Sequence, residues 1–198
     1  KKITVEDVKY ALSSHFQGTP YDPYAKSGDG LQKGKYRAIG INRNDFLALI
    51  QMRPGAPANC QAVQWLAFAS NAFNTLVPFY AAVDETPEYL ANTTKEVSTE
   101  NFYWSARMIA AMADASFAKS AIHIERYQNA VEAKGHALLN KYDKKAAKVT
   151  DPAESRRLLE EANLEIAKML KEETGNTLDH VLFELSNSMK NAFSRSDA

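Results

Sequence analysis

The sequence predicts an α+β protein in which an antiparallel sheet packs against helices. Short runs rich in β-branched and aromatic residues, separated by turn residues, occupy residues 35–83. From about residue 98 onward, apolar residues recur at helical spacing over much longer runs. The polar turn "NRND" between the first two strand-like runs favours an antiparallel hairpin.

The first residues predict a helix followed by a long irregular loop. Residues 5–16 carry apolar side chains on one side, and Thr4 is a suitable N-cap before them. The next segment, "QGTPYDPYAKSGDGLQKGK", is rich in Gly, Pro, Asp and Ser, which is typical of a loop. Its tyrosines, Tyr21 and Tyr24, indicate that the loop packs against the body of the protein.

Four strands are expected after this loop. They are 35–41, 46–53, 60–69 and a short strand within 77–83. The third run is apolar at both odd and even positions, which is typical of a strand covered on both faces. We therefore expect the sheet to lie between two layers.

The remaining chain predicts about four helices. A helix capped by Ser98 or Thr99 is followed by a second over about 120–147. Asp151 and Pro152 mark the start of a third helix, and Gly175 is expected to end it.

A last helix is expected over 177–193. We divide the chain into a sheet-containing domain, 1–147, and a helical C-terminal extension, 148–198, packed on it.

Composition excludes several classes of partner. Of the 198 residues, 45% are hydrophobic, and Lys+Arg and Asp+Glu number 24 each, so no net field favours nucleic acid or a membrane surface. No apolar run is long enough to span a bilayer, and no secretory signal pattern is present. A single cysteine excludes an internal disulfide. Together these features favour a cytoplasmic protein.

The sequence offers weak candidates for metal binding and nucleophilic catalysis. His180 and Glu184 are four residues apart on one helix, but a surface pair is the favoured interpretation. We predict no metal site and no cofactor. Cys60 is interpreted as a small buried apolar residue, with a nucleophilic role as the alternative.

The stretch "WLAFASNAFNTLVPFY" at 65–80 poses a sharper question, because small polar residues interrupt a hydrophobic run. A buried amide without partners costs about 1–3 kcal/mol, so these groups require partners. One interpretation is a turn in which Asn and Ser satisfy the backbone. The other is a cleft in which Ser70, Asn71 and Asn74 face a peptide substrate or a developing oxyanion.

Four blocks of sequence resemble the C-terminal half of one enzyme family. They are "ITVEDVKYALSSHFQGTPYDPY", "YRAIGINRNDFLALIQMR", "WLAFASNAFNTLVPFY" and "VSTENFYWSARMIAAMADASF". The family is dipeptidase A, a group of cysteine peptidases in the N-terminal-nucleophile hydrolase superfamily, related to secernins and penicillin V acylases. The resemblance implies an αββα sandwich and cleavage of dipeptides by an N-terminal cysteine whose own amino group is the base, without a cofactor.

The resemblance gives no catalytic role to any residue here, since residue 1 is Lys. It implies that the nucleophile belongs to a missing N-terminal half, and that this chain alone is inactive. The absence of an initiator Met fits a fragment, a processed product or deliberate trimming.

Asn71, Asn74 and Ser70 are the candidate substrate-binding residues. Arg37 and Arg43 are candidates to hold a substrate carboxylate, with surface ion pairs as the alternative.

The implied partners are a dipeptide and the missing half, with self-association through an exposed apolar face as a further expectation. A non-catalytic interaction or scaffold module is the alternative function. A complete enzyme that uses Cys60 is a third interpretation.

Overall fold

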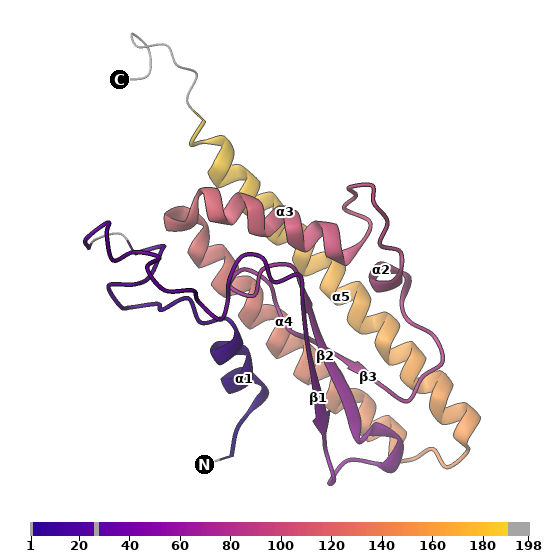
Figure 1. Cartoon of the computed structure of the whole chain (residues 1–198). Coiled ribbons are helices and arrows are strands. Elements are labelled where there is room, and N and C mark those ends of the chain that lie inside the picture. The colour runs from indigo at the N-terminus through magenta and orange to yellow at the C-terminus, as the bar shows by residue number, and fades with distance from the viewer. Residues whose placement is uncertain (1, 26–27, 190–198) are drawn as a thin grey trace.

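The α+β prediction is confirmed: the protein combines a small antiparallel sheet with helices (Figure 1). The computed structural model describes residues 2–25 and 28–189. Its elements, in chain order, are α1 (Val5–Leu12), β1 (Phe46–Met52), the short 3₁₀ helix η1 (Ala58–Cys60), β2 (Ala62–Phe68), β3 (Val77–Tyr80), α2 (Glu88–Ala91), α3 (Phe102–Ala115), α4 (Phe117–Ala146) and α5 (Pro152–Ser186).

The sheet is a meander in the order β1-β2-β3, with both pairs antiparallel. Phe46 of β1 lies opposite Phe68, and Leu66 of β2 lies opposite Val77. The strands predicted over 46–53, 60–69 and 77–83 are therefore confirmed, each with narrower bounds.

One face of the sheet packs on the helical layer. Every second residue of β2, including Trp65 at 0% exposure, points into a core shared with α4 and α5. The hydroxyl of Tyr80 donates to the carbonyl of Leu139 in α4 at 2.9 Å. Asn163 of α5 lies at the outer edge of β3, where its amide exchanges two hydrogen bonds with the backbone of Tyr80, at 2.9 and 3.0 Å. This side chain thus replaces a neighbouring strand.

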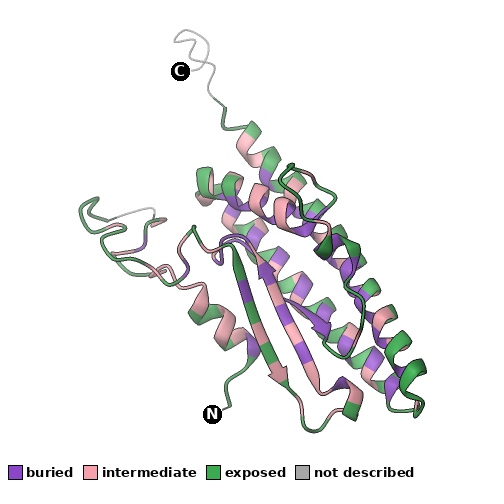
Figure 2. Ribbon diagram, turned by 45° about the vertical axis from the view of Figure 1, so that its right-hand side comes forward, coloured by how far each residue is buried: buried purple, intermediate pink, exposed green. Residues whose placement is uncertain are grey.

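The second face is covered at β3 and open at β1. All four residues of β3 are buried, but Phe46, Ile50 and Met52 of β1 are 54%, 69% and 64% exposed. Figure 2 shows exposed residues alternating along β1 with residues that are buried or of intermediate exposure. The expectation of a sheet covered on both faces is therefore wrong for β1. Of the helices, α5 packs on β3 and α3 packs on β2, where the Phe68 and Phe102 rings lie 5.3 Å apart.

The segment 35–41 is not a strand, so the hairpin predicted around "NRND" is wrong. Gly40 explains why: its N–H donates to the carbonyl of Ser14 at 2.8 Å, just beyond α1. A Cβ atom on Gly40 would lie 2.5 Å from the backbone of Ser13. The segment therefore packs against the chain that follows α1, and an alternating pattern alone does not reveal such a partner.

Gly175 does not end a helix, because α5 continues through it to Ser186. A glycine inside a helix costs about 1 kcal/mol relative to alanine. Burial of Thr174, Thr177 and Val181 on the same helix offsets this cost, and Thr174 hydrogen-bonds the Tyr127 hydroxyl of α4 at 2.8 Å. The predicted last helix is therefore the end of α5, and its residues from 190 onward lie outside the described part of the chain.

Helix starts are predicted with mixed success. Asp151 caps α5 as expected, accepting from the backbone of Glu154 at 2.7 Å. The cap of α3 is Asn101 rather than Ser98 or Thr99. The proposed domain boundary falls in the connection between α4 and α5, and both helices contribute to the same two core clusters.

None of the helices in the described ranges combines the length and the apolar character needed to cross a lipid bilayer.

Candidate functional site

The polar interruption at 70–75 forms a buried turn between β2 and β3. Ala69 turns the chain with a φ of 64°, and the N–H groups of Phe73 and Asn74 both donate to the carbonyl of Ser70 at 3.0 Å. We call residues 69–75 the polar corner. Its Ser, Asn and Thr side chains are all at most 4% exposed, so each needs a partner inside the protein.

The two asparagines of the corner are held by α1. Asn71 donates its amide to the carbonyl of Leu12 at 3.2 Å, and Asn74 donates to the carbonyl of Ala69 at 2.8 Å. The ammonium of Lys9 donates to the carbonyl of Asn71 at 2.7 Å and to the side-chain oxygen of Asn74. Burial lowers the pKa of Lys9 to about 7. These contacts match the turn interpretation of both asparagines, and their role toward a substrate stays a prediction.

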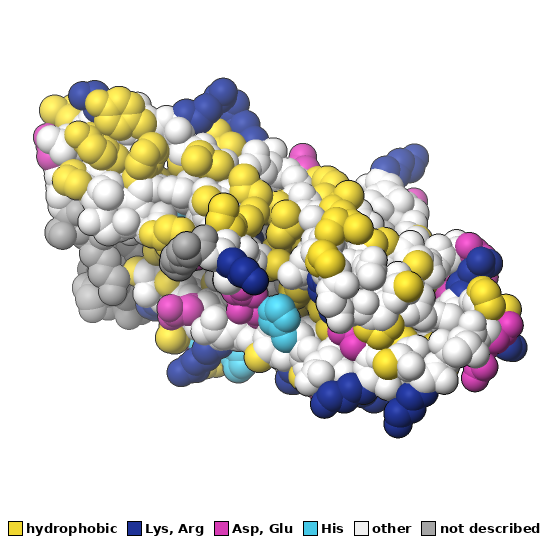
Figure 3. Space-filling model, turned by 90° about the horizontal axis from the view of Figure 1, so that it is seen from below, with side chains coloured by type: hydrophobic (Ala, Val, Ile, Leu, Met, Phe, Trp, Pro, Cys, Tyr) yellow, Lys and Arg dark blue, Asp and Glu magenta, His cyan; other side chains and the backbone are white. Residues whose placement is uncertain are grey.

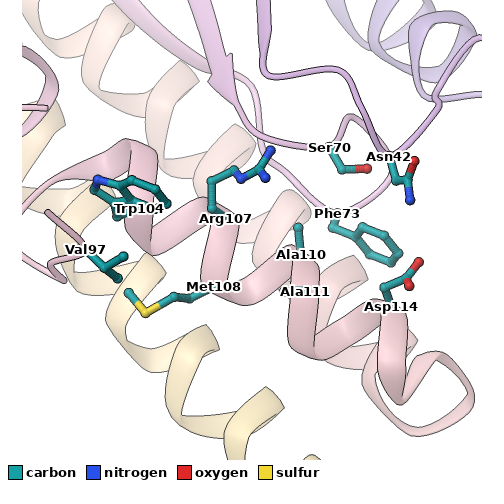
Figure 4. A pocket seen from close by; sticks show the side chains of 10 residues that line it. All are labelled: Asn42, Ser70, Phe73, Val97, Trp104, Arg107, Met108, Ala110, Ala111 and Asp114. Carbon is teal, nitrogen blue, oxygen red and sulfur yellow. The ribbon is translucent and has the colours of Figure 1, made fainter. Parts of the chain in front are cut away.

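Ser70 differs from the asparagines because its hydroxyl is buried and has no hydrogen-bond partner in the described structure. It lies in the wall of a cavity of about 380 Å³ between the polar corner and α3. Figure 4 shows Ser70 and Asn42 on one side of this cavity, with α3 on the other. The lining residues are Asn42, Ser70, Phe73, Val97, Trp104, Arg107, Met108, Ala110, Ala111 and Asp114.

The cavity has a cationic and an anionic group on one helix. Arg107 and Asp114 are seven residues apart in α3, which places both on the same side, about 10.5 Å apart along the axis. One N–H group of Arg107 contacts the carboxylate of Asp45. Asp114 accepts from the hydroxyl of Tyr24 at 2.7 Å. Burial, and then this carboxylate, raise the pKa of Tyr24, so the phenol stays protonated and acts as a donor.

A second cavity, of about 440 Å³, adjoins the first, since Asn42 and Asp114 line both. Arg37 and Arg43 line this second cavity. The fold thus brings both predicted arginines and Ser70 to adjoining cavities, and turns the two asparagines toward α1. The loop that carries Tyr21 and Tyr24 is expected from the sequence to pack against the body of the protein. This is confirmed for Tyr24, whose ring stacks on that of Phe117 with the ring centroids 4.3 Å apart.

A third cavity of about 250 Å³ lies beside Lys9. Near it, ligand atoms of Glu6, Glu132 and His136 all lie within 4.8 Å of one another. His136 and Glu6 are hydrogen-bonded at 2.9 Å, and this bond lowers the pKa of Glu6 against the effect of burial. Burial and the neighbouring Glu6 raise the pKa of Glu132. Sequence spacing could not reveal this trio, because Glu6 is far from the other two along the chain.

His180 and Glu184, which are four residues apart on α5, each contact His123 of α4. Glu184 lies 3.5 Å from the ring nitrogen of His123 in α4, and the rings of His123 and His180 stack at 5.0 Å. These contacts join α4 to α5.

Cys60 is poorly placed to be a nucleophile. The residue is 0% exposed, and burial together with the neighbouring Asp143 raises the pKa of its thiol to about 12. A thiol with this pKa is almost fully protonated at neutral pH, and the thiolate is the reactive form. Asp143 itself pairs with Arg53 at 2.8 Å. These features match the inert interpretation of Cys60.

A family profile and several known proteins match this chain. The profile of peptidase family C69 matches residues 1–130. A dipeptidase of Bifidobacterium longum is 42% identical over 234 aligned positions, covering 100% of this chain and 44% of that protein. A probable dipeptidase A of Streptococcus pyogenes serotype M3 is 44% identical, covering 100% of this chain and 41% of that protein. The chain thus spans less than half the length of these curated relatives.

Proposed function

This chain belongs to peptidase family C69, and from that premise we propose that it forms part of an enzyme that hydrolyses dipeptides. The observation that carries the proposal is the similarity to dipeptidases along the whole chain, including the polar corner and the helices that support it. The predicted dipeptide substrate agrees with cavities of 380 and 440 Å³, which fall within the range typical of small-molecule sites.

We further propose that the nucleophile is an N-terminal cysteine on polypeptide other than these 198 residues. The protonated, buried thiol of Cys60 supports this proposal, since it leaves the chain without a reactive thiolate of its own. An N-terminal cysteine carries its base on the same residue, because its α-amino group can accept the thiol proton. In this arrangement the polar corner contributes the wall of the substrate cleft, with Ser70, Asn71, Asn74 and Arg37 as the substrate-binding candidates.

The open face of β1 is the proposed contact with that further polypeptide. β1 pairs on one side only in the described sheet, so backbone groups along its other edge are available to another strand. Complete burial of each of Phe46, Ile50 and Met52 would contribute about 1.5–3 kcal/mol. Because these side chains are only 54%, 69% and 64% exposed, covering what remains exposed would contribute on the order of 3–6 kcal/mol in all. Seen from below, hydrophobic side chains also gather across the middle of the surface, with Lys and Arg around its rim (Figure 3).

Release of free amino acids from dipeptides tests this function. The assay compares the 198-residue chain with a polypeptide of its relatives' length that contains it. We expect turnover by the longer polypeptide only, inhibition by a thiol-alkylating reagent, and an unchanged rate in Cys60→Ser. Turnover by the 198-residue chain that Cys60→Ser abolishes would assign the nucleophile to Cys60. A longer polypeptide that releases no amino acid from any dipeptide would reject the proposed function.

A further inference from the structure

The cavity between the polar corner and α3 has the features of a site for a small zwitterion. We propose that it binds an unblocked dipeptide by both ends, with the α-carboxylate at Arg107, the α-ammonium at Asp114 and the peptide group at Ser70. The inference rests on the proposed function for the class of substrate. It adds the place of binding, the orientation of the ligand and the reason for its length.

The first support is the hydroxyl of Ser70. The residue is 3% exposed, its Oγ atom has no partner in the described structure, and it lines the cavity. Leaving a buried hydroxyl unpaired costs about 1–3 kcal/mol, so a ligand that supplies the missing partner gains from it. Ser105 provides a contrast, because it is equally buried and donates to the carbonyls of Asn101 and Thr99, at 2.9 and 3.1 Å.

The second support is the spacing of the two charged residues along α3. Seven residues of α-helix place Arg107 and Asp114 about 10.5 Å apart along the axis of α3. An extended dipeptide spans at most about 7 Å, and a hydrogen bond of about 2.8 Å at each end brings the total to roughly 13 Å. The flexible side chain of Arg107 adjusts to the difference. A tripeptide is longer by about 3.5 Å and fits this spacing less well.

The third support is that both charged groups retain hydrogen-bonding capacity. Arg107 contacts Asp45 through one nitrogen, and a guanidinium has five N–H donors. Asp114 accepts from Tyr24 through one oxygen, which leaves its second oxygen for an ammonium group. Figure 4 shows both side chains extending from α3 beside the cavity, with the ring of Phe73 nearby.

The walls predict the preferred orientation of an apolar side chain. Trp104 and Met108 lie near the Arg107 end of the cavity. At the Asp114 end the small side chains of α3 lie beside the ring of Phe73, which is only 1% exposed and so offers a ligand little apolar surface (Figure 4). A dipeptide held with its carboxylate at Arg107 places its C-terminal side chain against Trp104 and Met108. Alanyl-leucine is therefore a suitable probe, and leucyl-alanine is the matched reversed sequence.

Calorimetric titration of the 198-residue chain tests the two ends separately. The ligands are alanyl-leucine, its N-acetyl derivative and its C-terminal amide. We expect each modification to weaken binding about tenfold or more, because each removes a hydrogen bond between charged groups. Leucyl-alanine and alanyl-alanyl-leucine should also bind more weakly than alanyl-leucine.

Substitutions assign each end to its residue. In Asp114→Asn, N-acetylation of the ligand should no longer weaken binding, and in Arg107→Gln the same should hold for amidation. Arg37→Gln tests the alternative placement of the carboxylate in the adjoining cavity, which Arg37 lines. Arg126→Gln is the control, since Arg126 is exposed on α4 and lines neither cavity. Ser70→Ala should weaken alanyl-leucine without lowering the urea midpoint of unfolding, whereas Ser105→Ala should lower that midpoint and leave binding unchanged.

Three results would overturn the inference: no heat of binding with millimolar alanyl-leucine, equal binding of the free and blocked dipeptides, or loss of binding in Arg37→Gln but not in Arg107→Gln. None of them depends on turnover. Hydrolysis by the longer polypeptide together with any of these results would leave the proposed function standing and reject this site. Binding that meets these expectations, without hydrolysis by the longer polypeptide, would support this site and reject the proposed function.

Discussion

Lys9 connects α1 to the polar corner and predicts an unusual dependence of stability on pH. Its ammonium donates to the carbonyl of Asn71 at 2.7 Å and to the side-chain oxygen of Asn74, and both acceptors are neutral. Burial disfavours the charged form, and the pKa of Lys9 falls from 10.5 to about 7. In the unfolded chain the same group returns to its ordinary value near 10.4.

The direction in which stability changes with pH follows from the number of protons that the folded and unfolded states bind. Between pH 7 and about 10 the unfolded chain keeps the Lys9 proton and the folded protein releases it, so the free energy of unfolding rises with pH. Below pH 7 both states are protonated, and the cost of burying the charge remains in full. One pKa unit corresponds to about 1.4 kcal/mol, so raising the pH from 6 to 9 should add roughly 1–3 kcal/mol through Lys9.

Urea unfolding of the wild-type chain and of Lys9→Met at pH 6 and pH 9 measures this contribution. Methionine has a similar length but no titratable group. We expect the free energy of unfolding to rise by about 1–3 kcal/mol more in the wild type than in Lys9→Met over this range. Lys2→Met, at an exposed lysine, is the control and should behave like the wild type. The same pH dependence in the wild type and Lys9→Met would refute the buried, deprotonating ammonium.

Three further predictions concern the glycines of the long helices, the hydrogen bonds of Asn163, and the exposed face of β1. Gly175→Ala should raise the free energy of unfolding, measured in urea, by about 0.5–1 kcal/mol because the site is open, whereas Gly135→Ala should lower it, since its Cβ would lie 2.8 Å from a proline of β3. Equal changes in the two variants would contradict this. Asn163→Ala should cost about 2–4 kcal/mol in urea unfolding by leaving the Tyr80 backbone unpaired, and a cost below 1 kcal/mol would dismiss that role. Ile50→Ser should reduce self-association in sedimentation without lowering stability, and unchanged association would exclude this face.

The candidate site was only partly accessible to sequence reasoning. The composition of 70–75 marked the polar corner, because small polar residues in a hydrophobic run need a physical reason. It did not distinguish Ser70, whose hydroxyl lacks a partner, from Asn71, which α1 holds through a contact 59 residues away in sequence. Arg107 and Asp114 carry no local signal, since charged residues on a helix usually face solvent.

The sequence by itself determined the class of fold, most helices, three strands and the family, because these depend on periodicity and on local chemistry such as the Asp151 cap. Only the tertiary structure decided that 35–41 is not a strand and that α5 passes through Gly175. Both outcomes depend on distant partners, the chain just after α1 in one case and α4 in the other. Packing free energy from such contacts exceeds local propensities of about 1 kcal/mol, and a local pattern does not encode it.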